Sequence, residues 1–212
     1  MTAIDVRRDK AAPPSMADDF VRRAEARELT IGIIGLGYVG LPLAEALLKT
    51  GFRIIGFDVD QSKLRAIGVG KTYIKHISDE RIAKMRDSGF LEVTSDPQRL
   101  KAADALLLCV PTPLNAHREP DLSYVESTTK TLGSVLRRGQ LVVLESTTYP
   151  GTSDEVVRPI LEQASGLKSG VDFAIAYSPE REDPGNIDFN TTSIPKGGTV
   201  RVEQGMTLYS IS

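Results

Sequence analysis

Residues 29–40 have the sequence Leu-Thr-Ile-Gly-Ile-Ile-Gly-Leu-Gly-Tyr-Val-Gly. The first half is a β-rich apolar run, and three glycines follow it at the spacing G-x-G-x-x-G. Four apolar residues then recur at helical spacing: Val39, Leu43, Ala46 and Leu47. This pattern predicts a strand, a glycine turn and an amphipathic helix packed by that face. Gly51 predicts the helix end, and residues 52–57 predict a second strand.

The alternation of strands and helices continues along the chain. Continuous apolar runs predict three further strands, at 105–110, 141–144 and 173–177. Helix starts are predicted at Ser78, at Asp96 before Pro97, and at two capping boxes, Ser123 with Glu126 and Thr152 with Glu155. Such alternation predicts an α/β fold, a Rossmann-type doubly wound parallel sheet with helices on both faces. Ligands of such sheets bind outside the carboxyl ends of the strands.

The chain divides into three predicted parts. Residues 1–28 form a mobile, charged N-terminal tail that ends in a short helix from Asp18, residues 29–195 form the Rossmann domain, and residues 196–212 form a divergent C-terminal tail. No apolar segment is long enough to span a bilayer, and the N-terminus lacks the apolar core of a signal peptide. We therefore expect a cytoplasmic protein without a membrane partner.

Composition and charge narrow the function further. A net charge of -2 gives no electrostatic reason to expect a nucleic-acid partner. The single cysteine, Cys109, falls inside a predicted buried strand and is interpreted as a small hydrophobe, not a nucleophile. His76 and His117 have no partner at metal-ligand spacing, so we expect both to face solvent and no metal to bind.

The glycine turn has the context of a dinucleotide-binding fingerprint. Gly35 permits the tight turn, Gly37 lets the backbone approach a pyrophosphate, and Gly40 lets the helix pack close to the sheet. Asp58, at the end of the next strand, can accept hydrogen bonds from both ribose hydroxyls and would repel a 2′-phosphate. Lys63, about one helical turn later, can reach the same ribose or a phosphate, so NAD is favoured over NADP.

Other interpretations of these residues remain open. The glycines can simply turn the chain while Asp58 caps the next helix. FAD and S-adenosylmethionine also bind to related glycine loops.

Five motifs in a fixed order resemble a known family. They are Gly-Tyr-Val-Gly-Leu-Pro-Leu-Ala (37–44), Val-Pro-Thr-Pro-Leu (110–114), Glu-Pro-Asp-Leu-Ser-Tyr-Val (119–125), Glu-Ser-Thr-Thr-Tyr-Pro-Gly-Thr (145–152) and Ser-Pro-Glu-Arg-Glu-Asp-Pro-Gly-Asn (178–186). Together, between Leu29 and Lys196, they resemble the UDP-glucose/GDP-mannose dehydrogenase family, in particular its UDP-N-acetylhexosamine 6-dehydrogenase branch.

The resemblance implies an NAD-dependent oxidation of a sugar C6 alcohol to a carboxylate, through a cysteine-bound thioester, on a UDP-sugar that feeds polysaccharide biosynthesis. It implies that Tyr38, Val39 and Gly40 lie at the pyrophosphate, that Asp58 and Lys63 hold the adenosine ribose, and that Pro111, Thr112 and Thr147 lie at the nicotinamide end. Thr147 would also hold a water molecule, for which Glu180 would be the general base.

The strand-end polar residues also have structural interpretations. A carboxylate such as Glu180, partly desolvated by cofactor and sugar, can have its pKa raised toward the working pH, but it can equally be a surface glutamate. The Thr147 hydroxyl can satisfy backbone groups near the strand end. Glu145 and Arg181 can orient a ligand or form structural ion pairs.

In the family that these motifs resemble, the chain continues into a dimerising helix, a segment with the catalytic cysteine and a second α/β domain. Residues 197–212 do not resemble these elements. We expect a truncated or frame-shifted product of a gene for a homodimeric dehydrogenase. The competing hypothesis is a non-catalytic NAD-binding module. A hydroxyacid-type Rossmann dehydrogenase would leave residues 178–181 unexplained.

Overall fold

The computed structural model describes residues 16–114 and 120–178. Within them, six parallel strands form one sheet of order β3-β2-β1-β4-β5-β6. The strands are β1 Thr30–Ile34, β2 Arg53–Phe57, β3 Leu91–Thr94, β4 Ala105–Leu108, β5 Leu141–Leu144 and β6 Ala174–Tyr177. All strands point the same way, but the chain adds β2 and β3 on one side of β1 and β4, β5 and β6 on the other, as in a Rossmann sheet. The predicted fold class is confirmed.

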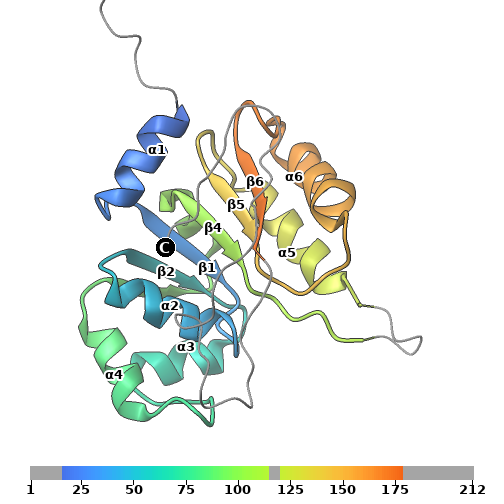
Figure 1. Ribbon diagram of the computed structural model, residues 1–212. Helices are drawn as coiled ribbons and strands as arrows, with labels where there is room; N and C mark the ends of the chain where they lie inside the picture. The colour runs from blue at the N-terminus through green and yellow to red at the C-terminus, as the bar shows by residue number, and fades with distance from the viewer. Residues whose placement is uncertain (1–15, 115–119, 179–212) are drawn as a thin grey trace, which may run out of the picture.

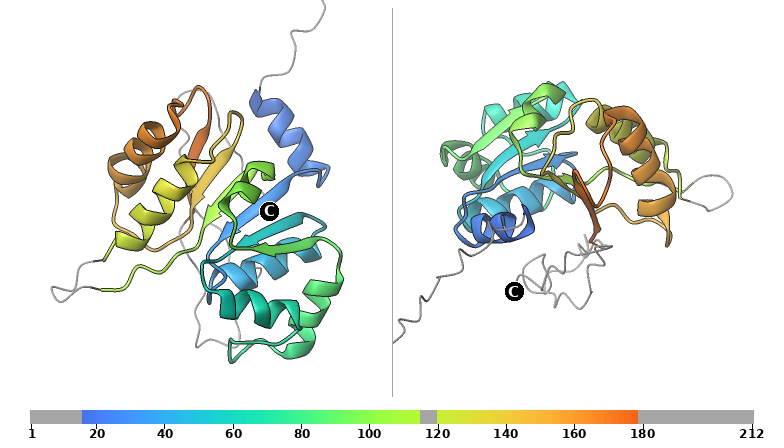
Figure 2. Two further views of the ribbon diagram at one scale, coloured as in Figure 1. Left: turned by 180° about the vertical axis from the view of Figure 1, so that it is seen from behind. Right: turned by 90° about the horizontal axis from the view of Figure 1, so that it is seen from above.

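Helices cover both faces of the sheet (Figures 1 and 2). The α-helices are α1 Met16–Glu25, α2 Gly40–Lys49, α3 Gln61–Gly68, α4 Asp79–Asp87, α5 Ser123–Gly133 and α6 Arg158–Ser165. Two shorter helical segments are η1 Pro97–Ala102 and η2 Ser153–Val157. None of the helices in the described ranges combines the length and the apolar character needed to cross a membrane.

Two hydrophobic clusters, one on each face, follow from the alternation of side chains along the strands. Ile31 and Ile33 of β1 belong to the cluster that includes residues of α1, α2, α3 and α4. Ile34, with Leu106 and Leu108 of β4, belongs to the cluster that includes residues of η1, α5 and α6. The strands β1 and β4 are therefore covered on both sides, which explains their continuous apolar sequences.

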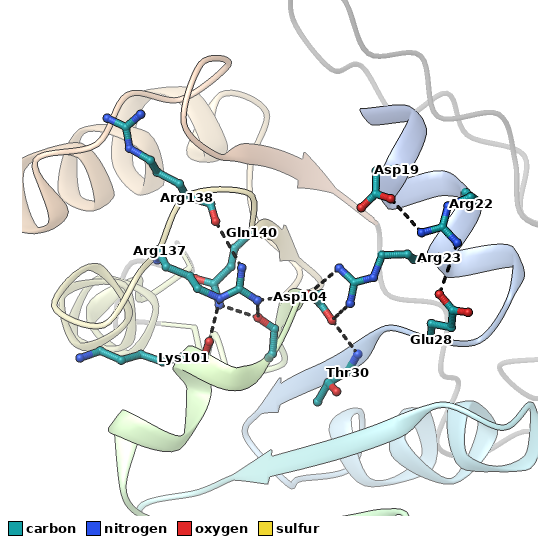
Figure 3. A network of polar contacts seen from close by, with 11 residues as sticks. Asp19, Arg22, Arg23, Glu28, Thr30, Lys101, Asp104, Arg137, Arg138 and Gln140 are labelled. Atoms are coloured by element: carbon teal, nitrogen blue, oxygen red, sulfur yellow. Dashed lines mark hydrogen bonds and ion pairs between the residues drawn. The ribbon is translucent and has the colours of Figure 1, made fainter. Parts of the chain in front are cut away.

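The N-terminal helix is held at the edge of the sheet where the strands begin (Figure 3). Asp104, just before β4, is 7% exposed. Its carboxylate accepts two hydrogen bonds from Arg23 of α1, at 3.1 and 2.9 Å, and one from Arg137 at 3.1 Å. The Thr30 N–H donates to the same carboxylate at 2.9 Å. This ion-pair network joins α1, β1, β4 and the turn before β5.

Several predicted element boundaries need correction. Helix α1 begins at Met16, two residues before the predicted start; residues 1–15 lie outside the described residues. Ser78 caps α4, accepting from the Arg81 N–H, and Asp96 caps η1, accepting from the Gln98 N–H, as predicted.

Both predicted capping boxes, at Ser123 and Thr152, are wrong. Ser123 is the first residue of α5, and its N–H donates to Asp121 Oδ1 at 2.9 Å, so Asp121 acts as the cap. Thr152 already has helical backbone angles, and its hydroxyl donates to the Tyr149 carbonyl at 2.8 Å. A residue inside a turn cannot cap the helix that continues it.

The packing face of α2 also differs from the prediction. Leu41 and Ala44 are almost fully buried, whereas Val39, Leu43 and Leu47 pack only at the margin of the core. Gly40 explains the shift, because a Cβ built there would lie 1.9 Å from the Gly35 carbonyl oxygen. The helix approaches the sheet at Gly40, and the residues that share this side are buried most deeply.

Candidate dinucleotide-binding site

The candidate site lies at the carboxyl edge of the sheet, beside the reversal of strand order. The last residues of four strands are neighbours in register: Ile34 pairs with Phe57 and with Leu108, and Leu108 pairs with Leu144. The segments that follow these strands therefore begin at one edge. They bring together most of the residues that the sequence predicts, on four separate stretches of chain.

The three fingerprint glycines are required for different physical reasons. Gly35 has a φ of 95°, and a Cβ there would lie 2.6 Å from the Cys109 carbonyl oxygen. Gly40 has no room for a Cβ because of the Gly35 carbonyl. At Gly37, by contrast, a Cβ would have no neighbouring atom of the described residues within 4 Å, and the Gly37 φ is not among the positive values. The fold thus requires Gly35 and Gly40, whereas the space at Gly37 is left open by the protein.

Asp58 is the buried acidic residue beside this loop, with 5% of its surface exposed. Its Oδ2 accepts from the Leu36 N–H of the glycine loop at 2.8 Å, and its Oδ1 accepts from the Asp60 N–H at 2.9 Å. Helix α3 is capped by Asp60, whose side chain accepts from the Ser62 N–H. The alternative that Asp58 caps this helix is therefore wrong.

Lys63 reaches back from α3 to the same carboxylate. Its Nζ lies 2.8 Å from Asp58 Oδ2, and its side chain is 29% exposed. A carboxylate offers about four lone-pair positions, and three are taken by Leu36, Asp60 and Lys63. One of the four positions, on Oδ1, is therefore not used by these three partners.

The loops after β4 and β5 are joined by side-chain hydrogen bonds. The Thr112 hydroxyl donates to the Thr147 carbonyl at 2.7 Å, and the Ser146 hydroxyl donates to the Val110 carbonyl at 2.7 Å. Pro111 and Thr147 are exposed at this edge. The two strand ends therefore form one connected rim on the β4–β5 side of the glycine loop.

Of the remaining predicted residues, Tyr38 and His76 are exposed, whereas Cys109 and Glu145 are buried or partly buried. Tyr38 is 54% exposed, and its ring centroid lies 6.0 Å from that of His76, which is also exposed, as predicted. Cys109 is buried, as predicted, but it directly follows β4 and does not lie inside the strand, which ends at Leu108. Glu145 is partly buried, and its N–H donates to the Leu108 carbonyl at 3.0 Å.

Three further predicted residues, His117, Glu180 and Arg181, lie outside the described residues. In the described ranges, no group of three or more His, Cys, Asp or Glu side chains could hold a metal ion.

Tyr73 is a residue of this site that the sequence analysis did not identify. Its hydroxyl donates to the Leu36 carbonyl at 2.7 Å, although the two residues are 37 positions apart. Burial, followed by the nearby charges of Asp58 and Asp60, raises the pKa of Tyr73 above its usual value of 10.0. The phenol therefore stays protonated, as a donor to a carbonyl requires. No local pattern around Tyr73 indicates this contact.

Strand order, glycine turn and buried carboxylate together define a Rossmann-type dinucleotide-binding domain. The chain belongs to the UDP-glucose/GDP-mannose dehydrogenase family, because residues 29–209 match the NAD binding domain of that family. The cofactor is accordingly NAD, and the Gly37 backbone beside Asp58 is not covered by any side chain of the described residues at its Cβ position.

Individual relatives agree with this assignment. The chain is 38% identical over 180 residues to a UDP-N-acetyl-D-glucosamine 6-dehydrogenase of Salmonella typhi, covering 84% of this chain and 41% of that protein. It is 39% identical over 160 residues to a UDP-N-acetyl-D-mannosamine dehydrogenase of Pyrococcus horikoshii, covering 75% and 38%. The chain thus spans about two fifths of the length of these relatives.

A solved structure shows the same architecture. A ternary complex of GDP-mannose dehydrogenase from Pseudomonas aeruginosa superimposes with a TM-score of 0.68 at 36% identity, covering 71% of this chain and 36% of that one.

Proposed function

We propose that this chain is the NAD-binding part of a nucleotide-sugar 6-dehydrogenase. The full enzyme would oxidise the C6 alcohol of a UDP-hexose or UDP-N-acetylhexosamine to the carboxylate of a UDP-uronic acid, as a cytoplasmic homodimer. The names of the relatives support the substrate class. The cofactor part rests on one observation: within the described residues, the Gly37 backbone is uncovered at its Cβ position and lies next in the chain to Leu36, whose N–H is held by the buried Asp58 carboxylate.

Each residue of the site would have a distinct part in holding NAD. The backbone of residues 35–40, including Tyr38 and Val39, would line the pyrophosphate. Asp58 and Lys63 would hold the adenosine ribose, which agrees with the lone-pair count at Asp58. When bound, NAD supplies the acceptor for a hydride from the sugar.

The rim formed by the β4 and β5 loops would receive the nicotinamide end. Pro111, Thr112 and Thr147 are the residues proposed for this role. The Thr112–Thr147 hydrogen bond supports it, since it fixes the two loops relative to one another. Thr147 would in addition hold a water molecule, and Glu180 would act on that water as a general base.

A non-catalytic NAD-binding module is the second candidate. It is favoured by Cys109, the single cysteine of the sequence, which is only 5% exposed at the end of β4. A buried thiol cannot capture a sugar aldehyde from solution. We therefore expect a polypeptide of these 212 residues to bind NAD without completing the oxidation of a UDP-sugar to its carboxylate through a thioester.

Two measurements on this polypeptide test the proposals separately. Calorimetric titration with NAD tests the cofactor site, and a wild-type protein that does not bind NAD would refute it. The absorbance of reduced nicotinamide, followed with UDP-N-acetylglucosamine, its manno epimer and UDP-glucose, tests turnover. Rates in the usual enzyme range of about 1–1000 per second, with two reduced nicotinamides formed per sugar, would refute the non-catalytic candidate.

A further inference from the structure

The residue between the first two fingerprint glycines is held at both of its backbone polar groups. The Leu36 N–H donates to Asp58 Oδ2 at 2.8 Å, and the Leu36 carbonyl accepts from the Tyr73 hydroxyl at 2.7 Å. The Leu36 side chain is fully buried and packs in the core. Two side chains from different parts of the chain thus fix the backbone orientation immediately before Gly37.

Tyr73 is itself firmly placed, because it lies in an anchored segment between α3 and α4. Its neighbour Ile74 is 1% exposed, and Ile77 is 2% exposed. The Thr72 N–H donates to Asp79 Oδ1 at 2.8 Å, which ties the segment to the first residue of α4. The hydroxyl of Tyr73 therefore reaches Leu36 from a fixed support.

The same segment is also tied to α2, the helix that follows the glycine loop. Arg81 of α4 donates to the His76 carbonyl at 3.2 Å and to the Glu45 carboxylate of α2. Glu45 is 6% exposed. The segment that carries Tyr73 and the helix that carries the loop are thus linked independently of the Tyr73–Leu36 hydrogen bond.

Peptide geometry connects Tyr73 to the open space of the site. A trans peptide unit is planar, so the carbonyl of one residue and the N–H of the next point in opposite directions. The bond that fixes the Leu36 carbonyl toward Tyr73 therefore turns the Gly37 N–H away from Tyr73. Among the described residues no atom lies within 4 Å of a Cβ built at Gly37, so the backbone there is not covered at that position.

We propose that Tyr73 is a positioning residue for NAD: by holding the Leu36 carbonyl, it fixes the Leu36–Gly37 peptide so that the Gly37 N–H donates to the cofactor pyrophosphate. This inference rests on the proposed placement of the pyrophosphate at the glycine loop. Tyr73 does not touch the cofactor and acts through the peptide unit. Its role differs from that of Asp58, which holds the N–H side of Leu36 and faces the ribose.

The test uses Tyr73→Phe, which removes one oxygen atom, and Tyr124→Phe as the matched control. Tyr124 lies on α5 and is 50% exposed. NAD, ADP-ribose and AMP are titrated by calorimetry at a temperature well below unfolding. A hydrogen bond of ordinary strength predicts that Tyr73→Phe weakens NAD and ADP-ribose by a similar factor of about three- to tenfold. AMP, which lacks the pyrophosphate, should lose less, and Tyr124→Phe should bind all three as the wild type does.

A spectroscopic measurement separates positioning from general stability. In ligand-free Tyr73→Phe, the Gly37 amide resonance should shift, while that of Gly32 in β1 stays in place. In the wild type, NAD should also shift the Gly37 amide, a result that does not depend on any variant folding. Unchanged NAD affinity in folded Tyr73→Phe, or a Gly37 amide that ignores NAD in the wild type, would overturn the inference. A wild-type protein that binds no NAD would instead refute the proposed function.

Discussion

The two ends of the sheet each hold a buried aspartate, but their surroundings differ. Asp104, at the amino edge, is bound by two guanidinium groups and one backbone N–H, and its partners close the edge under α1 (Figure 3). Asp58, at the carboxyl edge, is bound by one lysine and two backbone N–H groups, beside the open space at Gly37. Burial of a carboxylate alone therefore does not mark a ligand site. A candidate ligand site is indicated where a buried carboxylate has an unused acceptor position and the neighbouring backbone is uncovered, as at Asp58 and Gly37.

The largest expected effect is the loss of NAD binding in Gly37→Val. The valine side chain would enter the space assigned to the pyrophosphate, so NAD affinity should fall by at least about 100-fold, or roughly 2.7 kcal/mol. The melting temperature should change little, because no atom lies within 4 Å of the new Cβ.

Gly68→Val is the matched control for this variant. Gly68 also has open space at its Cβ and no positive φ, and it lies at the end of α3. The Gly68→Val variant should bind NAD normally. Normal NAD binding by Gly37→Val would disprove the assignment of the pyrophosphate to the glycine loop.

Asp104→Ala should have the opposite phenotype, a loss of stability with normal binding. Removal of one partner from a buried ion pair costs about 3–5 kcal/mol. Here the Arg23 and Arg137 side chains are 30% and 41% exposed and are therefore partly solvated, so about 2–3 kcal/mol is expected. For a domain of this size that lowers the melting temperature by roughly 4–12 °C.

Asp87→Ala, which removes an exposed pair with Arg86, is the control and should leave the melting temperature unchanged. If Asp104→Ala weakened NAD binding in the folded protein, the two edges would be coupled and the contrast between them would fail.

Asp58→Ala should change cofactor preference, and it should also cost stability, because the Leu36 and Asp60 N–H groups lose their acceptor. The wild type is expected to bind NAD at least about tenfold more tightly than NADP, because the carboxylate loses a ribose hydroxyl partner and meets a 2′-phosphate of like charge. In Asp58→Ala the preference should narrow toward equality, since Lys63 is freed to meet the phosphate.

Asp60→Ala, two residues away at the cap of α3, should keep the wild-type preference. Calorimetry with both cofactors decides between these outcomes. Equal affinities in the wild type would refute the ribose assignment.

The fold was largely predictable because its pattern is carried by local sequence. The strands β1 and β4 are buried on both faces, so their continuous apolar runs are visible without any knowledge of partners. β3 is absent from the sequence-based predictions. Turn residues flank it, Ser88-Gly89 before and Ser95-Asp96-Pro97 after, but its four residues are only partly buried at the sheet edge and show no continuous apolar run. The capping boxes failed because Ser123 and Thr152 already lie inside a helical turn: the Glu126 N–H donates to the Leu122 carbonyl, and the Glu155 N–H donates to the Gly151 carbonyl.

The candidate site was predictable only in part, for the same physical reason. Gly35, Gly37 and Gly40 occur at a local spacing that has a mechanism, and Asp58 ends the next strand. Tyr73 contributes through a contact 37 positions away in the sequence, which only the packing of its segment creates. Sequence also could not separate the glycines that the fold requires from the one that leaves space open. That distinction needs the atoms around each Cβ.

The smallest expected effect is an acid-dependent one at the amino edge. Burial acts to raise the pKa of Asp104, but the Thr30 N–H, Arg23 and Arg137 outweigh it, so the pKa lies below its ordinary value of 3.8. A depressed pKa means that the folded state binds fewer protons than the unfolded state, so this contribution to stability is complete above about pH 5. It is lost as the pH falls below 3.8 toward the folded-state pKa.

Urea unfolding of wild type and Asp104→Asn between about pH 6 and pH 3 measures this contribution. The stability difference between the two proteins should be constant near pH 6 and should shrink as the pH approaches 3, because the wild-type carboxyl becomes neutral like the amide. Glu45→Gln is a useful comparison, since the Glu45 pKa is also lowered, by Arg81 and Lys49 against burial, from 4.5. The stability difference between wild type and Glu45→Gln should begin to shrink at a higher pH than the difference between wild type and Asp104→Asn, because the ordinary pKa of Glu45 is 4.5 and that of Asp104 is 3.8. A difference for Asp104→Asn that stayed constant down to pH 3 would mean that the network stabilises the edge through packing and not through charge.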